Sequence, residues 1–139
     1  MANPGPASTV SNHPQQVSTN QALRLLAVAK GVNISQTGDY ALPVINSTTY
    51  EPTNVIVTNA SAALSTAAAG VYTATGGSTG GGSAVVTSGT LTCAATNGVE
   101  QLSVNVGTSF TAQTMYFNVA TAQGSGVTAD VYVYGYDFS

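Results

Sequence analysis

The sequence predicts an all-β protein, a jelly-roll-like antiparallel β-sandwich with an extended N-terminal arm. The first observation is the strict alternation of two uncharged side-chain sets within residues 131–136, which is the strongest local pattern of a β-strand. The second is the spacing of turn residues, which recur about every 8–12 positions and leave roughly eight or nine short strands. The third is a composition with 43% hydrophobic and 5% charged residues, which favours a buried core over a disordered chain.

The alternation belongs to a predicted final strand at residues 127–138, which has two different faces. Val131 and Val133 form one face. The other face consists of Tyr132, Tyr134, Tyr136 and Phe138. Valines and a phenylalanine elsewhere in the chain can pack on the valine face, so we expect that face in the core. No comparable apolar set remains to cover the tyrosines, which are therefore the candidate contact surface toward another copy or another protein.

The chain divides into an arm at residues 1–21 and a β-sandwich domain at residues 22–139. The arm contains three of the five prolines among small and polar residues, and proline removes backbone donors and stiffens the chain. One interpretation is a disordered tail. The other is an extended arm that becomes ordered on a neighbouring subunit, with His13 and Pro14 as its candidate interface residues.

The first half of the domain opens on one ambiguous segment, residues 21–30, whose leucines and alanines fit a helix face and a strand equally well. A strand is favoured because the rest of the chain is β-like, and it continues through residues 31–36. A turn at 37–39 leads to a return strand at 40–45, which Pro43 restricts to a sheet edge or a bulge. The next segments are predicted as a polar loop at 46–52, a buried strand at 53–59, a loop at 60–69 and a strand at 70–75.

The second half of the domain begins with a glycine-rich stretch at 76–83. This stretch lacks the lysine and the following helix of a phosphate-binding loop, so we interpret it as a mobile hairpin tip. Leu102, Val104 and Val106 alternate with polar residues and are expected to point inward. The remaining elements are predicted as strands at 84–88, 101–106, 114–121 and 127–138, an apolar run at 89–95, and turns at 97–98, 107–109 and 124–126.

The charge of the chain argues against two classes of partner. The net charge is −3, and Arg24 and Lys30 are the only lysine or arginine residues. Phosphate contacts need cations, so we expect no nucleic-acid partner, and a basic helix on a membrane surface is excluded for the same reason. The chain has no run of about 20 apolar residues to span a bilayer. It also lacks a signal-peptide pattern, so we expect synthesis in a cytoplasm.

No combination of residues predicts catalysis or metal binding. His13 is the only histidine and Cys93 the only cysteine, so no nucleophile has an evident base and no metal-binding cluster exists. Cys93 is expected to be a small buried hydrophobe. Asp130 and Asp137 should point to opposite faces of one strand about 23 Å apart, which is too far for a catalytic pair. We therefore expect no enzyme activity, no cofactor and no metal.

Three stretches of the chain also support a family resemblance. They are residues 53–61, residues 68–74 before the glycine-rich stretch, and residues 115–124 with 128–135. Together they resemble small head proteins of tailed bacteriophages, the cement or decoration proteins that bind an icosahedral capsid. The resemblance covers about residues 24–139 and includes no catalytic signature. It implies a jelly-roll or related β-sandwich, a structural role and the major capsid protein as partner.

We therefore expect a non-enzymatic virion protein, made in the host cytoplasm, that binds the capsid surface and stabilises contacts between major capsid protein subunits. A homo-oligomer, either a dimer or a trimer, is expected on the capsid, with residues 1–21 reaching to a neighbour. Modest contacts in each copy add up over many symmetric copies.

Two alternative functions stay open. A carbohydrate-binding head fibre or adhesin module would use the tyrosines as a platform for sugars. A hydrolase would need Glu51 or Glu100 beside a second carboxylate.

Overall fold

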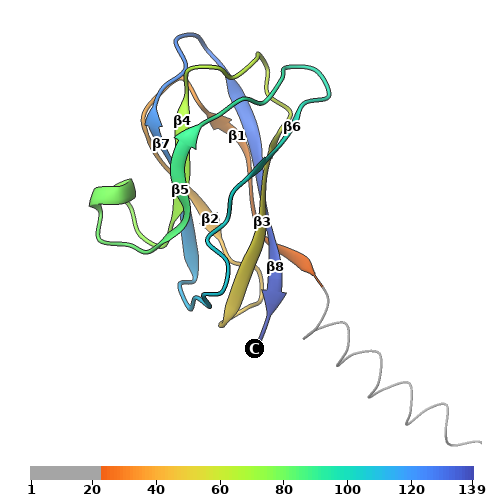
Figure 1. The fold of residues 1–139 in the computed structure, drawn as a ribbon, viewed down its shortest axis with the longest axis vertical. Coiled ribbons are helices and arrows are strands. Elements are labelled where there is room, and N and C mark those ends of the chain that lie inside the picture. The colour runs from red at the N-terminus through yellow and green to blue at the C-terminus, as the bar shows by residue number, and fades with distance from the viewer. Residues whose placement is uncertain (1–22) are drawn as a thin grey trace, which may run out of the picture.

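Strands are the main regular elements of the protein (Figure 1), and the computed structural model describes residues 23–139. The predicted arm at residues 1–21, with His13 and Pro14, lies outside these described residues. The elements are β1 Arg24–Asn33, β2 Gly38–Pro43, β3 Tyr50–Thr58, β4 Ala68–Tyr72, the 3₁₀ turn η1 Gly77–Thr79, β5 Ala84–Thr90, β6 Val99–Leu102, β7 Thr114–Thr121 and β8 Thr128–Asp137.

The strands form two four-stranded antiparallel sheets, in the orders β1-β8-β3-β6 and β2-β7-β4-β5. Four pairs are nested in one another along the chain: β1 with β8, β2 with β7, β3 with β6, and β4 with β5. The joins of β8 to β3 and of β7 to β4 complete the sheets. A long hairpin rolled up in this way is a jelly roll, and the predicted jelly-roll-like antiparallel β-sandwich is confirmed for residues 23–139.

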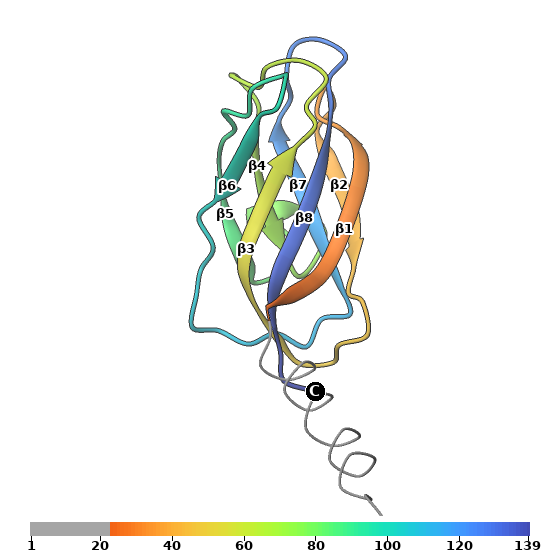
Figure 2. The ribbon, with the colours of Figure 1, turned by 90° about the vertical axis from the view of Figure 1, so that its right-hand side faces the viewer.

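The two sheets lie face to face as the layers of a sandwich. Figure 2 looks onto β6, β3, β8 and β1, with the second sheet behind them. The start of β1 and the end of β8 lie at the same end of the sandwich (Figure 1). Hydrogen-bond register explains this, since Arg24 at the start of β1 pairs with Gly135 near the end of β8.

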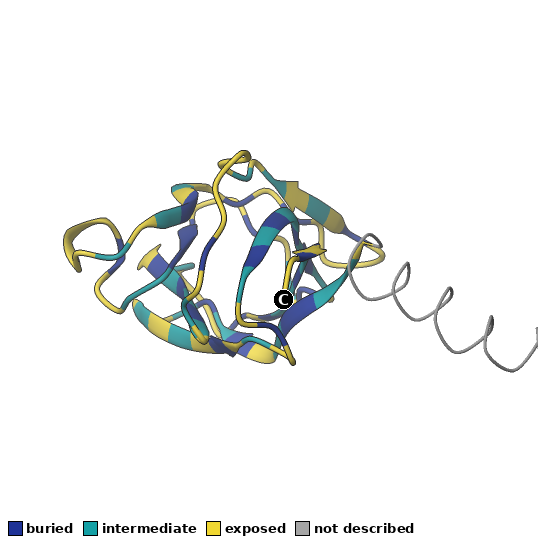
Figure 3. Ribbon diagram, turned by 90° about the horizontal axis from the view of Figure 1, so that it is seen from below, coloured by how far each residue is buried: buried dark blue, intermediate teal, exposed yellow. Residues whose placement is uncertain are grey.

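The core lies between the sheets and receives alternate side chains from most strands (Figure 3). On β7, Met115 and Phe117 are fully buried. On β8, Val131 and Val133 are fully buried as well. The prediction that the valine face of the final strand belongs to the core is therefore confirmed.

The ambiguous first segment is a strand, β1, as predicted. Its register with β8 shifts between Leu25 and Ala27, and this irregularity lets the consecutive residues Leu26 and Ala27 both be buried. The predicted edge position of Pro43 is also confirmed, because in the described part of the chain β2 is the outermost strand of its sheet and pairs only with β7. Proline lacks the N–H that a residue of an interior strand donates to one of its two neighbouring strands.

The polar loop predicted at 46–52 is wrong in its last three residues, because β3 already begins at Tyr50. The Tyr50 ring is fully buried, and its hydroxyl donates to the carbonyl of Ala112 at 2.5 Å. Its backbone exchanges two hydrogen bonds with Phe110, at 3.0 and 2.7 Å. Burial raises the pKa of Tyr50 to about 12. Because polar residues precede Tyr50, the sequence pattern did not predict that this aromatic side chain belongs to the core.

The inward placement of Val106 is wrong, because this side chain is 68% exposed. β6 ends at Leu102, and the chain then leaves its sheet. The Asn105 N–H donates to the carbonyl of Val85 in β5 at 2.9 Å, which belongs to the other sheet. The alternation of apolar and polar residues continues to Val106, but the pairing with β3 ends at Leu102. Beyond Leu102 the alternation therefore does not indicate which side chains are buried.

The glycine-rich stretch joins β4 to β5, as predicted, and projects from the sandwich (Figure 1). Glycine is required at two of its positions because neighbouring atoms leave no room for a Cβ. A Cβ on Gly80 would lie 1.7 Å from the Thr75 carbonyl oxygen, and one on Gly77 would lie 2.4 Å from Oδ1 of Asn118. Asp39 anchors the start of the stretch, since its carboxylate accepts from the Gly76 N–H at 2.9 Å.

Candidate interaction surface

The tyrosines of β8 lie on the outer face of the β1-β8-β3-β6 sheet, because the valines between them point into the core. Register places apolar side chains of the two neighbouring strands beside these tyrosines. Tyr132 lies between Val28 of β1 and Ile56 of β3, and Tyr134 pairs with Leu25 of β1. We call this outer surface the tyrosine face, made of Leu25, Val28, Ile56, Tyr132, Tyr134 and Tyr136.

The tyrosine face is partly covered by its own members and partly open to solvent. Tyr132 and Tyr134 are half-buried, whereas Tyr136 is 39% exposed. A row of aromatic rings on one strand, flanked by aliphatic side chains of the two neighbouring strands, offers rigid apolar area together with hydroxyl groups, which is the composition of many protein contact surfaces.

The apolar surface continues past the tyrosine face to the end of the sandwich where the described chain begins. Leu23 is 52% exposed and Phe138 is 53% exposed. Because Arg24 pairs with Gly135, Leu23 lies level with Tyr136 on the outer side of the sheet. Alternation along the last strand puts Phe138 on the side of Tyr136.

The carboxylates of the chain are engaged within the fold. Each of the five accepts a hydrogen bond from a backbone N–H, four of them from another segment of the chain and Asp137 from Ser139, two residues further on. The pairs are Asp39 with Gly76, Glu51 with Gly107, Glu100 with Thr92, Asp130 with Gly31, and Asp137 with Ser139. The five acidic residues of the sequence are therefore hydrogen-bonded within the fold, including Asp130 on the outer side of β8 and Glu51 opposite Tyr136 at the border of the tyrosine face.

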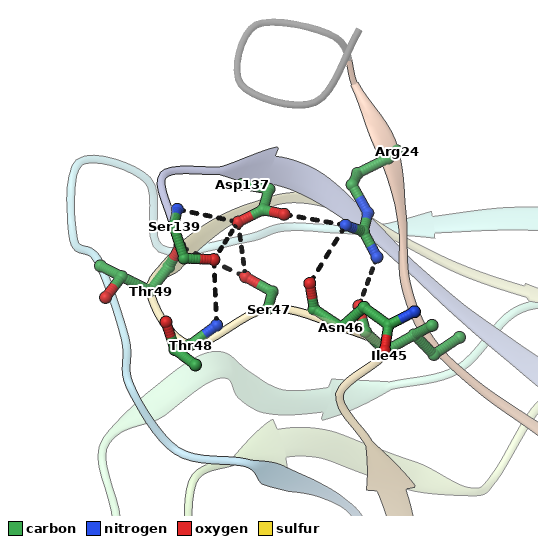
Figure 4. A network of polar contacts seen from close by, with 8 residues as sticks. All are labelled: Arg24, Ile45, Asn46, Ser47, Thr48, Thr49, Asp137 and Ser139. Carbon is green, nitrogen blue, oxygen red and sulfur yellow. Dashed lines mark hydrogen bonds and ion pairs between the residues drawn. The ribbon is translucent and has the colours of Figure 1, made fainter. Parts of the chain in front are cut away.

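Asp137 has the densest set of partners (Figure 4). Its carboxylate forms an ion pair with Arg24 at 2.8 Å and accepts from the Ser47 hydroxyl at 2.9 Å. It also accepts from the Ser139 N–H at 2.9 Å and from the Ser139 hydroxyl at 2.6 Å. Arg24 donates in addition to the carbonyl of Ile45. The network ties the start of β1 and the loop after β2 to the end of β8.

The surroundings of two aspartates favour their charged forms. Burial by itself would raise the pKa of Asp137, but hydrogen bonds from Ser139 and Ser47, together with the Arg24 charge, outweigh it and lower that pKa. The pKa of Asp130 is lowered by hydrogen bonds from the Asn59 side chain, at 2.9 Å, and from the Gly31 N–H, at 2.8 Å.

Replacing Asp137 with Asn should lower the free energy of unfolding by about 1–3 kcal/mol near neutral pH, because a charged acceptor is lost to Arg24, Ser47 and Ser139. A depressed native pKa stabilises the fold above the unfolded pKa, about 3.9, and this stabilisation is lost as pH falls through the native value. The difference between the parent protein and Asp137→Asn should therefore shrink in acid. Urea unfolding at neutral pH and below about pH 3 measures it. An equal difference at both pH values would contradict the assignment.

The sequence analysis located the tyrosines but missed their strand neighbours. Tyr132, Tyr134 and Tyr136 come together on one outer face, whereas His13 and Pro14 lie outside the described residues. Val28 and Ile56 each point outward within a predicted strand, and that outward apolar position was the available signal. Asp130 and Asp137 do lie on opposite sides of β8, with Asp137 buried and Asp130 half-buried on the outer side.

Cys93 is 2% exposed, and the prediction of a buried thiol is confirmed. Burial, followed by the nearby charge of Glu100, raises the pKa of this thiol.

Within residues 23–139, no group of three or more His, Cys, Asp or Glu side chains is placed to hold a metal ion. None of the helical segments in the same range is long and apolar enough to cross a membrane.

The sequence matches no protein-family model and no curated protein.

Proposed function

We propose that this protein is a structural component of a virus particle, which binds the outside of an icosahedral phage capsid and stabilises contacts between major capsid protein subunits. The observation that supports this most is the tyrosine face, an outer sheet surface of half-buried aromatic and aliphatic side chains. The proposal also draws on the resemblance of residues 24–139 to capsid decoration proteins.

The physical advantage of such a surface is low desolvation cost. Burying an ionised side chain at a contact costs several kcal/mol unless it finds a partner, and the carboxylates of this protein already have partners within the fold. Tyrosine rings supply contact area with few rotatable bonds, so they lose little conformational entropy on binding. Many copies on one shell then multiply a modest contact energy.

Co-sedimentation with assembled capsids tests the proposal. Purified protein is mixed with empty shells of the major capsid protein at increasing ratios, and the pelleted protein is quantified. We expect saturation at a fixed number of copies per shell subunit, with little dependence on salt because the proposed contact is not ionic. Absence of saturable binding would contradict the proposed function.

Tyr134→Ser should leave the domain folded and weaken capsid binding about tenfold or more, because Tyr134 lies at the centre of the tyrosine face and central aromatic anchors dominate contact energies. Tyr116→Ser is the matched control, since Tyr116 is half-buried on the outer side of the other sheet. Circular dichroism checks folding, and titration against capsids compares affinities. If Tyr134→Ser unfolds the domain, or if both variants bind equally well, the tyrosine face is not the contact.

A carbohydrate-binding head module is the second candidate. Register places the Asn54 amide beside Tyr134 and the Glu51 carboxylate beside Tyr136. Aromatic rings with amide and carboxylate neighbours can stack on sugars and bond their hydroxyls. A glycan array with the purified protein separates the two candidates, because saccharide binding lost in Tyr134→Ser would favour this one.

A further inference from the structure

β6 and β5 are the edge strands of the two sheets on the same side of the sandwich, and the packing between them is incomplete. β6 is only four residues long, and it pairs with β3 at Val55–Thr58, while no strand from residues 23–139 pairs with its other side. The chain after β6 crosses from one sheet to the other at Asn105. The Asn105 N–H donates to the Val85 carbonyl at 2.9 Å, and its side-chain amide donates to the Ala84 carbonyl at 3.1 Å. This crossing leaves open space on both sides of it.

Two adjoining hollows occupy that space, with volumes of about 280 and 440 Å³. The first lies between β6 and the β5 residues Thr87, Gly89 and Thr90. The second lies between Thr53 of β3 and the crossing segment up to Val106. Both are lined by residues 101–103, so they form one continuous depression, which we call the β6 groove.

The β6 groove has the character of a site for an extended peptide. Leu102 and Val104 are half-buried in its lining, and Val106, which also lines it, is 68% exposed. Glu100 is the one charged residue that lines it, and that carboxylate already accepts from the Thr92 N–H at 2.8 Å. An unpaired strand edge beside apolar side chains binds extended chains through backbone hydrogen bonds and side-chain pockets.

The N-terminal segment, residues 1–22, suits this groove in length and charge. It contains no Asp, Glu, Lys or Arg, so seating it would bury no unpaired charge, and Val10 and Val17 can meet the apolar lining. It joins the domain at β1, the opposite edge of the same four-stranded sheet. That sheet is about 14 Å wide at about 4.8 Å per strand spacing, whereas 22 extended residues span up to about 70 Å.

A second copy supplies the segment more readily than the same chain does. The described chain starts at Leu23, beside Arg24 at one end of the sheet, so residues 1–22 of the same chain would have to double back past β1 to reach β6. Residues 15–22 contain neither Gly nor Pro, the two residues best suited to a tight reversal. Donor edge β1 and acceptor edge β6 are also different surfaces, as required for a head-to-tail contact that closes into a ring.

We infer that the β6 groove binds residues 1–22 of a second copy of this chain, which gives a head-to-tail oligomer. The inference goes beyond capsid binding and does not depend on it, because self-association can be measured without any capsid. Failure of one proposal therefore leaves the other standing.

The first test blocks the groove in the full chain. Ser103 is exposed and lines both hollows, so Ser103→Trp should weaken self-association about tenfold or more and shift the sedimenting mass toward that of one chain. Ser125→Trp is the control, because Ser125 is exposed in the loop between β7 and β8. An unchanged mass for Ser103→Trp, or a parent protein that is monomeric at all concentrations, would overturn the inference.

The second test identifies the occupant and the donor chain. Val17→Cys protein is mixed with Ser103→Cys protein under mild oxidation, and the native thiol does not interfere because Cys93 is buried. A disulfide between the two chains, and none after mixing Ser125→Cys with Val17→Cys, supports the inference. Absence of the mixed disulfide, or a bond formed within single chains of the double variant Val17→Cys/Ser103→Cys at high dilution, would overturn it.

Discussion

Replacing Phe117 with Ala is expected to lower the free energy of unfolding by about 3–5 kcal/mol, the range for truncating a fully buried phenylalanine. Phe117 is 0% exposed and lies on β7. β7 is an inner strand that pairs with β2 through Tyr40 and with β4 through Val71. A cavity there cannot be filled by movement of one loop, since paired strands hold both sides. Because a domain of this size is stabilised by about 5–15 kcal/mol, the loss is a large share of the total.

Urea unfolding of dilute protein measures this loss, and Phe138→Ala provides the control. Phe138 is 53% exposed, so its truncation should change stability by about 0.5 kcal/mol or less. Both substitutions remove the same atoms, and only their burial differs. Equal losses in the two variants would mean that the sandwich core is not organised around β7 as described.

The second large effect is expected for Gly135→Ala, which adds a single methyl group to β8. That Cβ would lie 2.1 Å from the carbonyl oxygen of Glu51 and 2.8 Å from Cα of Pro52, both in the backbone of β3. Backbone in a paired strand cannot turn aside as a flexible side chain can, so β3 and β8 must separate locally. We expect a loss of about 3 kcal/mol, at the upper end for an overpacked site.

Thermal unfolding compares Gly135→Ala with Gly124→Ala, since a Cβ on Gly124 would meet no atom within 4 Å. Gly124→Ala should unfold at nearly the parent temperature, whereas Gly135→Ala should unfold several degrees lower. The close approach also brings β3 against β8 at the end of the tyrosine face. A mild effect in Gly135→Ala would show that β3 and β8 are packed less closely than the structure has them.

The strands that could be predicted from sequence are those with one buried face along their whole length. β7 was predicted with its observed bounds because Met115, Phe117 and Val119 alternate with polar or small residues between clear turns. The start of β3 could not be predicted, since Tyr50 follows a run of polar residues and reaches the core through tertiary contacts with Phe110 and Ala112. Alternation of apolar and polar residues indicates which side chains are buried only as long as the strand stays paired with the same neighbour.

The candidate surface could be predicted only along the strand that displays it. Alternation in β8 identified the tyrosines, but the sequence does not say which strands flank β8. β1 and β3 are distant in the chain and become neighbours of β8 through the roll of the sheets. The β6 groove was hidden for a similar reason, because it arises where the chain changes sheets at Asn105.

The hydrogen bonds that the carboxylates accept could not be predicted from the sequence either. Glu51 and Glu100 could have been solvated charges or members of a catalytic pair. Each instead accepts a backbone N–H from a distant segment, Glu51 from Gly107 at 2.7 Å and Glu100 from Thr92 at 2.8 Å. Such contacts depend on loop paths that no periodicity encodes.

The nested pairing of strands determines at which stage of synthesis and folding the tyrosine face is formed. β4 and β5 are neighbours in the chain, so their hairpin closes at low entropic cost, whereas β1 must wait for β8, its one strand partner within residues 23–139. β8 is also synthesised after the other seven strands of this domain, and it is an inner strand of the sheet that displays the tyrosines. A growing chain therefore has no finished contact surface to offer, and association is postponed until the domain is complete.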